Sequence, residues 1–157
     1  PQRVRLRGYL AAMEATGADP VVLEASQFTL EAGRDVTDRL IEDGNPVTAI
    51  MAANDLMAIG VMQSLSSHGL SIPDDISVAG FDDIMASALV TPALTTVAQF
   101  QDRLGARAAE LLLARLANGG SDPGQAEEMT FELVVRASVG RPKAMPVTKS
   151  SSREETQ

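Results

Sequence analysis

Two apolar runs, each ending abruptly in polar residues, constrain the fold of this chain more than any other feature. The first covers residues 47–53 and the second residues 76–81. Runs of this length without apolar–polar alternation are typical of strands that are buried on both faces, as in a parallel sheet. A helical pattern begins directly after the first run. The sequence therefore predicts an α/β fold.

Polar side chains follow both predicted strands at the point where each strand ends. Asn54 and Asp55 follow the first strand, and Asp82 and Asp83 follow the second. Ligands of parallel α/β sheets bind in the crevice beyond the carboxyl ends of the strands. We therefore expect these side chains to face one shared cleft.

The remaining pattern predicts further helices and strands around this sheet. Alternating helices and strands in the first half are typical of right-handed crossovers between parallel strands. On the first helix we expect Leu6, Tyr9, Leu10 and Met13 to form one apolar stripe. The expected helices cover 5–16, 30–43 (with Thr29 as N-cap), 55–68, 84–90 and 101–117, and the expected strands cover 21–23, 47–53, 76–81, 94–97 and 129–135.

Composition narrows the classes of function. Apolar residues make up 45% of the 157 residues and the net charge is −8, which predicts a globular domain that repels nucleic-acid backbones. The chain has no cysteine, and its two lysines, Lys143 and Lys149, lie near the C-terminus. The single His68 adjoins Gly69 at a predicted helix end, which favours a surface role. We therefore expect no enzyme activity, no metal and no cofactor.

The sequence shows neither an apolar stretch of the roughly 20 residues that span a bilayer nor a signal peptide. These observations predict a soluble, cytoplasmic protein without membrane contact. The last residues, 141–157, are polar and contain proline, so we predict a disordered tail there.

Three motifs resemble those of the LacI/GalR family of bacterial transcriptional regulators in their residues, order and spacing. They are ANDLMAIG at 53–60, PDDISVAGFDD at 73–83 and PALTTVAQ at 92–99. The resemblance implies the C-terminal part of a periplasmic-binding-protein-like effector domain. It implies a three-layer lobe of the type I fold with a parallel sheet, truncated here and covering residues 3–140.

In this family a small molecule, often a sugar or a purine, binds between two α/β lobes. The resulting movement is transmitted to an N-terminal helix-turn-helix domain, which this chain lacks together with most of the first lobe. The resemblance thus implies the effector-sensing and dimerisation module of a repressor. DNA would be contacted only through the missing helix-turn-helix domain.

The resemblance also implies five ligand-binding residues. Arg5 would supply a planar donor fork, Asp82 would accept ligand hydroxyl hydrogens, and Asn54 would offer a donor and an acceptor. Phe28 would cover the apolar face of a sugar ring, and Gln99 would face the cleft. Two alternatives stay open, because Asn54 and Asp82 could simply cap helices and Phe28 could be a core aromatic.

A homodimer contact is implied on the helix 55–68 and on the segment after the second motif. For the methionines among its candidates, a role as core filler is the alternative. The candidate contact residues are Met57, Val61, Met62, Met85 and Leu89.

The helix 101–117 would normally pack in the missing first lobe. Its apolar face then lacks a partner, so we expect the helix to fold back onto its own lobe or to pack against a second copy. This face comprises Leu104, Ala108, Leu111 and Leu112.

Two other classes of function remain as alternatives. One is a solute-binding protein of a sugar transporter, which shares the architecture. The other is a receiver-type phosphotransfer domain that uses Mg²⁺, but such a site requires a lysine at a strand end, and the body of this chain has none.

Overall fold

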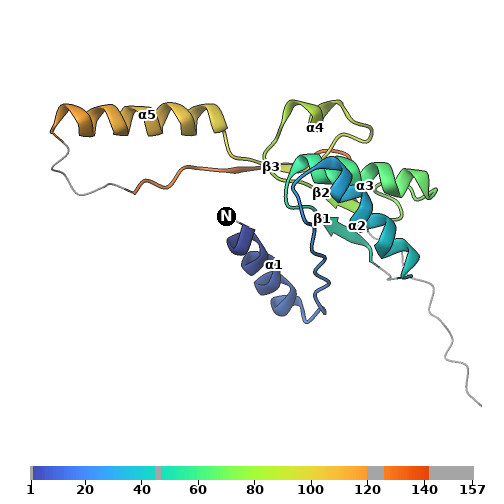
Figure 1. The fold of residues 1–157 in the computed structure, drawn as a ribbon. Helices are drawn as coiled ribbons and strands as arrows, with labels where there is room; N and C mark the ends of the chain where they lie inside the picture. The colour runs from blue at the N-terminus through green and yellow to red at the C-terminus, as the bar shows by residue number, and fades with distance from the viewer. Residues whose placement is uncertain (1, 45–46, 120–125, 142–157) are drawn as a thin grey trace, which may run out of the picture.

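The chain alternates helices with short strands, largely as the apolar pattern predicts (Figure 1). The computed structural model describes residues 2–44, 47–119 and 126–141, so the predicted disordered tail lies outside the described residues apart from Arg141. No helix in these ranges is long and apolar enough to cross a membrane. The elements are α1 (Gln2–Thr16), α2 (Leu30–Glu42), β1 (Ala49–Met51), α3 (Asp55–Ser67), β2 (Ser77–Ala79), α4 (Met85–Leu89), β3 (Thr96–Ala98), α5 (Gln101–Ala117) and β4 (Glu132–Val134).

The strands form the predicted parallel arrangement. β1 pairs with β2 in parallel, and two isolated parallel bridges, Ala79 with Thr95 and Asp82 with Ala98, connect β2 to β3. β4 then pairs antiparallel with β3. The strands are shorter than predicted, since each forms a regular ladder over only three residues. The carboxyl ends of β1, β2 and β3 therefore reach the same edge.

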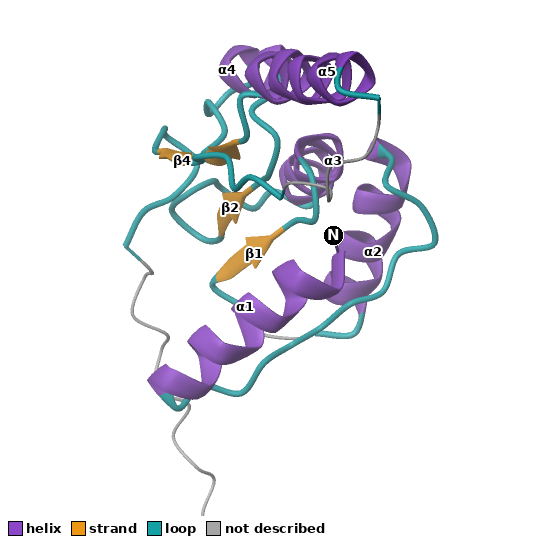
Figure 2. Ribbon diagram, turned by 90° about the vertical axis from the view of Figure 1, so that its left-hand side faces the viewer, coloured by secondary structure: helices purple, strands orange, loops and turns teal. Residues whose placement is uncertain are grey.

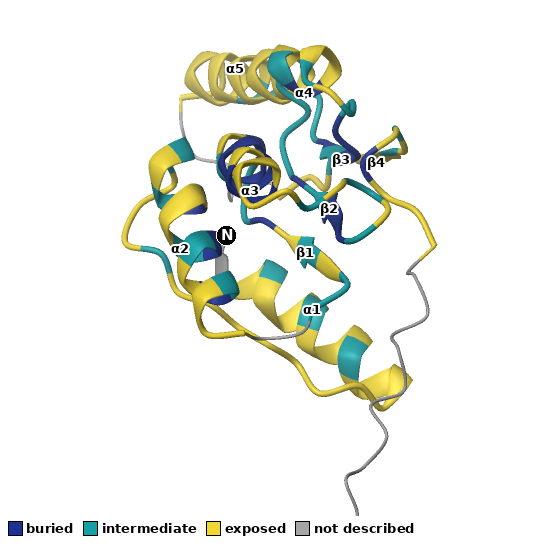
Figure 3. Ribbon diagram, turned by 90° about the vertical axis from the view of Figure 1, so that its right-hand side faces the viewer, coloured by how far each residue is buried: buried dark blue, intermediate teal, exposed yellow. Residues whose placement is uncertain are grey.

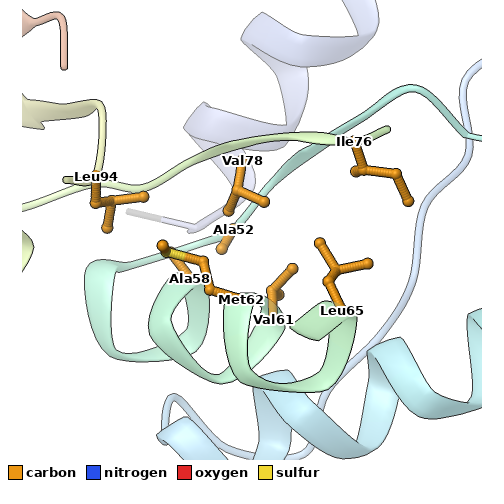
Figure 4. Packing of buried hydrophobic residues seen from close by; sticks show 8 residues of the cluster. All are labelled: Ala52, Ala58, Val61, Met62, Leu65, Ile76, Val78 and Leu94. Carbon is orange, nitrogen blue, oxygen red and sulfur yellow. The ribbon is translucent and has the colours of Figure 1, made fainter. Parts of the chain in front are cut away.

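Helices lie on both sides of this sheet. In Figures 1 and 2, α1 is on one side of β1, while α2 and α3 are on the other. The main core lies between α3 and the strands (Figure 4). Its members come from α3, from the strands and from the loops beside them. They are Ala52, Ala58, Val61, Met62, Leu65, Ile76, Val78 and Leu94.

A close approach between α2 and α3 explains why α3 is apolar on more than one face. A Cβ atom on Gly33 would lie 2.2 Å from the carbonyl oxygen of Met57, and one on Gly60 would lie 2.0 Å from that of Leu30. Only glycine allows this crossing. The face of α3 that points away from the sheet is thus covered by α2 of the same chain.

One buried residue, Asp55, connects four elements through its carboxylate and its backbone amide. The Asp55 side chain is fully buried, and its Oδ2 accepts hydrogen bonds from the Ile84 amide (3.0 Å) and the Ser87 hydroxyl (2.6 Å). Its Oδ1 accepts from the Thr96 hydroxyl (2.5 Å), while the Asp55 amide donates to the Phe81 carbonyl (2.9 Å). The start of α3 is thereby joined to the end of β2, to α4 and to β3.

The N-terminal part differs in one respect from the prediction. The half-buried positions of α1 are Arg5, Tyr9 and Met13, whereas Leu6 and Leu10 are exposed. Residues 21–23 form no strand, and their side chains are exposed. The amide and carbonyl of Val21 bond to the Tyr9 hydroxyl (3.2 and 3.3 Å) instead of to a strand.

Helix α5 spans the predicted residues but extends away from the body of the molecule (Figure 1). None of its residues is buried, and it is almost entirely coloured as exposed in Figure 3. Arg107 connects it to Glu127 through an ion pair of 2.8 Å. Of the two predicted alternatives, folding back onto its own lobe is wrong, because no helix or strand within the described residues covers α5. Packing against a second copy remains a prediction.

We predict that Asp55→Asn destabilises the chain by about 2–4 kcal/mol, because an amide NH₂ would face hydrogen-bond donors in a buried site. Urea unfolding followed by circular dichroism measures the change. Asp35→Asn, on the exposed face of α2, is the matched control and should leave the unfolding free energy unchanged. Equal stability of the two variants would contradict the role of Asp55.

We also predict that Gly60→Ala costs about 1–3 kcal/mol, since the added methyl group collides with the α2 backbone. The same substitution at Gly105 of α5, where a Cβ meets nothing within 4 Å, should be neutral or stabilising. The comparison uses the same unfolding measurement. A loss of stability in Gly105→Ala that matched the loss in Gly60→Ala would disprove the close-contact explanation.

Candidate functional site

Arg5 joins the carboxyl ends of β1 and β2. Its guanidinium lies over the Phe81 ring, 3.9 Å from the ring centroid, and its Nη1 donates a hydrogen bond to the Ala53 carbonyl. Stacking of a cation on an aromatic face is favourable, particularly when both groups are partly shielded from water. The helix α1 thereby brings a fixed positive charge to the edge where the strands end.

Asp82 lies at the same edge and is held by β3. Gln99, which directly follows β3, donates from Nε2 to the Asp82 Oδ1 (2.5 Å), and the Asp82 amide donates to the Val97 carbonyl (2.9 Å). Burial raises the pKa of the Asp82 carboxyl, while the charge of Arg5 and the Gln99 hydrogen bond lower it. Burial is the largest of these effects, so the pKa lies above its usual value.

Asn54 is engaged at both ends of its amide. Its Oδ1 accepts from the Met57 amide (2.9 Å) and so caps α3, and its Nδ2 donates to the Phe28 carbonyl (3.3 Å). Asn54 therefore caps a helix, which is one of the two roles predicted for it. Phe28 lies on the loop before α2 with 48% of its surface exposed, so it is not a core aromatic.

The structure thus brings the predicted residues together at one edge. Arg5, Asn54, Asp82 and Gln99 are all half-buried. Asn54, Asp82 and Gln99 follow the ends of neighbouring strands, and Arg5 reaches the same edge from α1. Phe28 joins the group through its backbone contact with Asn54. We call these five residues the rim. A small molecule could contact several of them from the solvent side.

Sequence reasoning missed two groups that support the rim. Phe81, the last residue of an apolar run, serves as the platform for Arg5. Arg136 is the second group: its Nη2 lies 2.6 Å from the Oδ1 of Asp83 in a half-buried ion pair beside the rim. A lone aromatic or acid in sequence gives no signal of such a partner, because both partners are distant along the chain.

The chemistry of the rim suits recognition of a polar molecule. It offers a guanidinium donor fork, a carboxylate acceptor and two side-chain amides. Within residues 2–44, 47–119 and 126–141, no group of three or more histidines, cysteines or carboxylates could hold a metal ion. The donors and acceptors of the rim can form hydrogen bonds to a small polar ligand.

The predicted dimer contact requires a correction. Val61 and Met62 are only 4% and 6% exposed, because they belong to the core under the sheet, so they offer almost no surface to a second copy. Met57 is half-buried beside that core. Met85 and Leu89 on α4 are strongly exposed, at 82% and 75%, and they alone provide an open apolar surface from the predicted set.

A family model and individual related sequences point to the same protein family. The model of the periplasmic binding protein-like domain matches residues 1–139. The HTH-type transcriptional repressor PurR of Pasteurella multocida is 37% identical over 139 residues, which are 87% of this chain and 41% of that protein. The repressor CytR of Escherichia coli (strain K12) is 35% identical over 137 residues, covering 85% of this chain and 40% of that protein.

Solved structures with the same fold include a LacI family transcriptional regulator from Enterococcus faecium with bound ribose (TM-score 0.82, 28% identity, 90% of this chain and 52% of that one). The lac repressor dimer bound to operator and the anti-inducer ONPF is similar as well (TM-score 0.79, 30% identity, 87% of this chain and 47% of that one). The chain spans about two fifths of the length of the curated relatives quoted above. It belongs to the periplasmic-binding-protein-like domain family, in the branch found in LacI-type transcriptional regulators.

Proposed function

We propose that this chain is the effector-sensing part of a LacI-type transcriptional repressor. Its ligand is a small, hydroxyl-bearing molecule such as a sugar, bound at the rim. The observation that carries the proposal is the meeting of Arg5, Asp82 and Gln99 where β1, β2 and β3 end. The relatives named as repressors favour a regulator over a transport protein.

The contacts within the rim suggest how a ligand would bind. Gln99 donates one hydrogen bond to the Asp82 carboxylate. A ligand hydroxyl can donate a second hydrogen bond to a remaining lone pair of that carboxylate. Arg5 keeps donors beyond the one used on Ala53, and its stacking on Phe81 holds the guanidinium plane in place. Because hydrogen bonds to charged groups contribute about 1.5–3 kcal/mol each, Arg5 and Asp82 should dominate ligand orientation.

Asn54 and Phe28 have smaller roles in this proposal. Asn54 already uses its oxygen as the α3 cap and its NH₂ on the Phe28 carbonyl, so it serves mainly to fix the loop next to the ligand. The half-exposed Phe28 ring remains free to cover an apolar ligand face. A further wall from the rest of the parent protein would complete the cleft.

The wider assembly is part of the same proposal. Residues 3–140 form the C-terminal lobe of the effector domain, and α5 packs in the lobe that this chain lacks. The exposed Met85 and Leu89 support a homodimer contact through α4. DNA binding belongs to a separate helix-turn-helix domain of the parent, in the cytoplasm. The rim performs no catalytic step.

We predict that Asp82→Ala and Arg5→Ala each weaken ligand binding about 10- to 100-fold, the equivalent of one hydrogen bond to a charged group. Gln99→Ala should have a smaller effect. The measurement is a thermal-shift screen of ribose, other sugars, polyols and nucleobases on the parent protein, followed by calorimetry. Asp35→Ala serves as the control. If a ligand bound the Asp82→Ala and Arg5→Ala variants as tightly as it binds the unmodified parent, the site would lie elsewhere.

Ligand affinity should also fall as the solution is acidified. A protonated Asp82 accepts hydroxyl hydrogens less well, and because its pKa is raised, the loss begins at a higher pH than for an ordinary aspartate. Calorimetric titration of the parent between neutral and mildly acidic pH measures the profile. Asp82→Asn should bind weakly and show a flatter profile. If the affinity of the unmodified parent and that of its Asp82→Asn variant changed with pH in the same way, Asp82 would be excluded as the titrating group.

A further inference from the structure

The backbone at Asp82 and Asp83 has a conformation that side chains disfavour. Their φ angles are 118° and 54°, and in the described part of the chain only Phe100 among other non-glycine residues has a positive φ. A positive φ is unfavourable for amino acids with a Cβ, although aspartate adopts it more readily than most. Two such residues in succession require surrounding contacts that hold them in place.

Hydrogen bonds fix the chain on either side of this turn. The Asp82 amide donates to the Val97 carbonyl (2.9 Å), and the Ile84 amide donates to the buried Asp55 carboxylate (3.0 Å). Asp83 lies between these two points. The middle of the turn is held by a contact of the Asp83 side chain.

That contact is an ion pair with Arg136, which follows β4. The Arg136 Nη2 lies 2.6 Å from the Asp83 Oδ1, and its Nη1 donates to the Leu94 carbonyl (2.8 Å). The Arg136 amide in turn donates to the Thr95 hydroxyl (2.9 Å). The two side chains are only 19% and 27% exposed, so water screens this pair less than a surface pair.

We propose that the Asp83–Arg136 ion pair is a positioning device for the ligand-binding carboxylate of Asp82. By holding Asp83 in the left-handed region, Arg136 directs the preceding side chain towards Gln99 and Arg5. The end of β4 thereby controls the geometry of the rim without contacting the ligand. This inference rests on the proposed function, because the orientation of Asp82 matters only if Asp82 binds ligand.

A purely stabilising ion pair would behave differently. Its removal would lower the free energy of unfolding but would leave the environment of Asp82 unchanged in the molecules that remain folded. A positioning pair controls that environment directly. The Asp82–Gln99 hydrogen bond and the burial of the Asp82 carboxyl therefore provide the distinguishing readouts.

The test is an NMR titration of the 157-residue chain that follows the Asp82 carboxyl carbon and the Gln99 side-chain amide. We expect Arg136→Met and Asp83→Asn to lose the hydrogen-bonded Gln99 amide signal. In both, the pKa of Asp82 should fall towards that of an exposed aspartate. One variant removes a positive charge and the other a negative charge, so a downward shift in both reports orientation and not local charge.

Two further variants make the result specific. Arg136→Lys keeps the charge but loses the two-pronged contact, so it should shift the Asp82 pKa in the same direction by a smaller amount. Arg107→Met removes an exposed arginine that pairs with Glu110 and Glu127, and it should leave both Asp82 and Gln99 signals unchanged.

An unchanged Asp82 pKa together with an intact Gln99 signal in folded Asp83→Asn and Arg136→Lys would overturn the proposal. These two variants decide the question even if Arg136→Met does not fold. The readout needs no ligand, so it is independent of the proposed function. A ligand screen insensitive to Asp82→Ala would count against the proposed function alone.

Discussion

The buried carboxylate of Asp55 is the interaction on which the rest of the structure depends. It collects hydrogen bonds from the amide of Ile84 and the hydroxyls of Ser87 and Thr96, so the start of α3, the approach to α4 and the strand β3 share one anchor. Burying a carboxylate is costly unless its lone pairs are satisfied. Here each oxygen has a donor, and the neighbouring Gly80 leaves room for Oδ1.

The rim follows from this anchor. With β2 and β3 held together, Asp82 and Gln99 come within hydrogen-bonding distance, and α1 adds the charge of Arg5 over Phe81. Four of the five rim residues are half-buried and Phe28 is exposed, whereas Asp55 is fully buried and supports the fold. The side chain that reaches solvent can serve a ligand, whereas the one beneath it cannot.

Much of the secondary structure could be predicted because its causes are local. Thr29 and Asn54 bond to amides three residues further on, so each predicts a helix start without knowledge of the fold. The bounds of α5 follow equally from its own periodicity and its terminal Asn118-Gly119. The segment 21–23 shows the limit, since β-branched residues predict a strand only if a neighbouring strand is available to pair with it.

The sequence alone determined the α/β order, the helix caps and the placing of Asn54, Asp82 and Gln99 near strand ends. The tertiary structure decided which acids are buried, that Gly33 and Gly60 allow two helices to touch, and that Asp83 pairs with Arg136. It also decided that Met62 is core while Met85 is surface. Caps and periodicity act over a few residues, whereas burial and ion pairing depend on groups separated by tens of residues, which only the folded chain brings together.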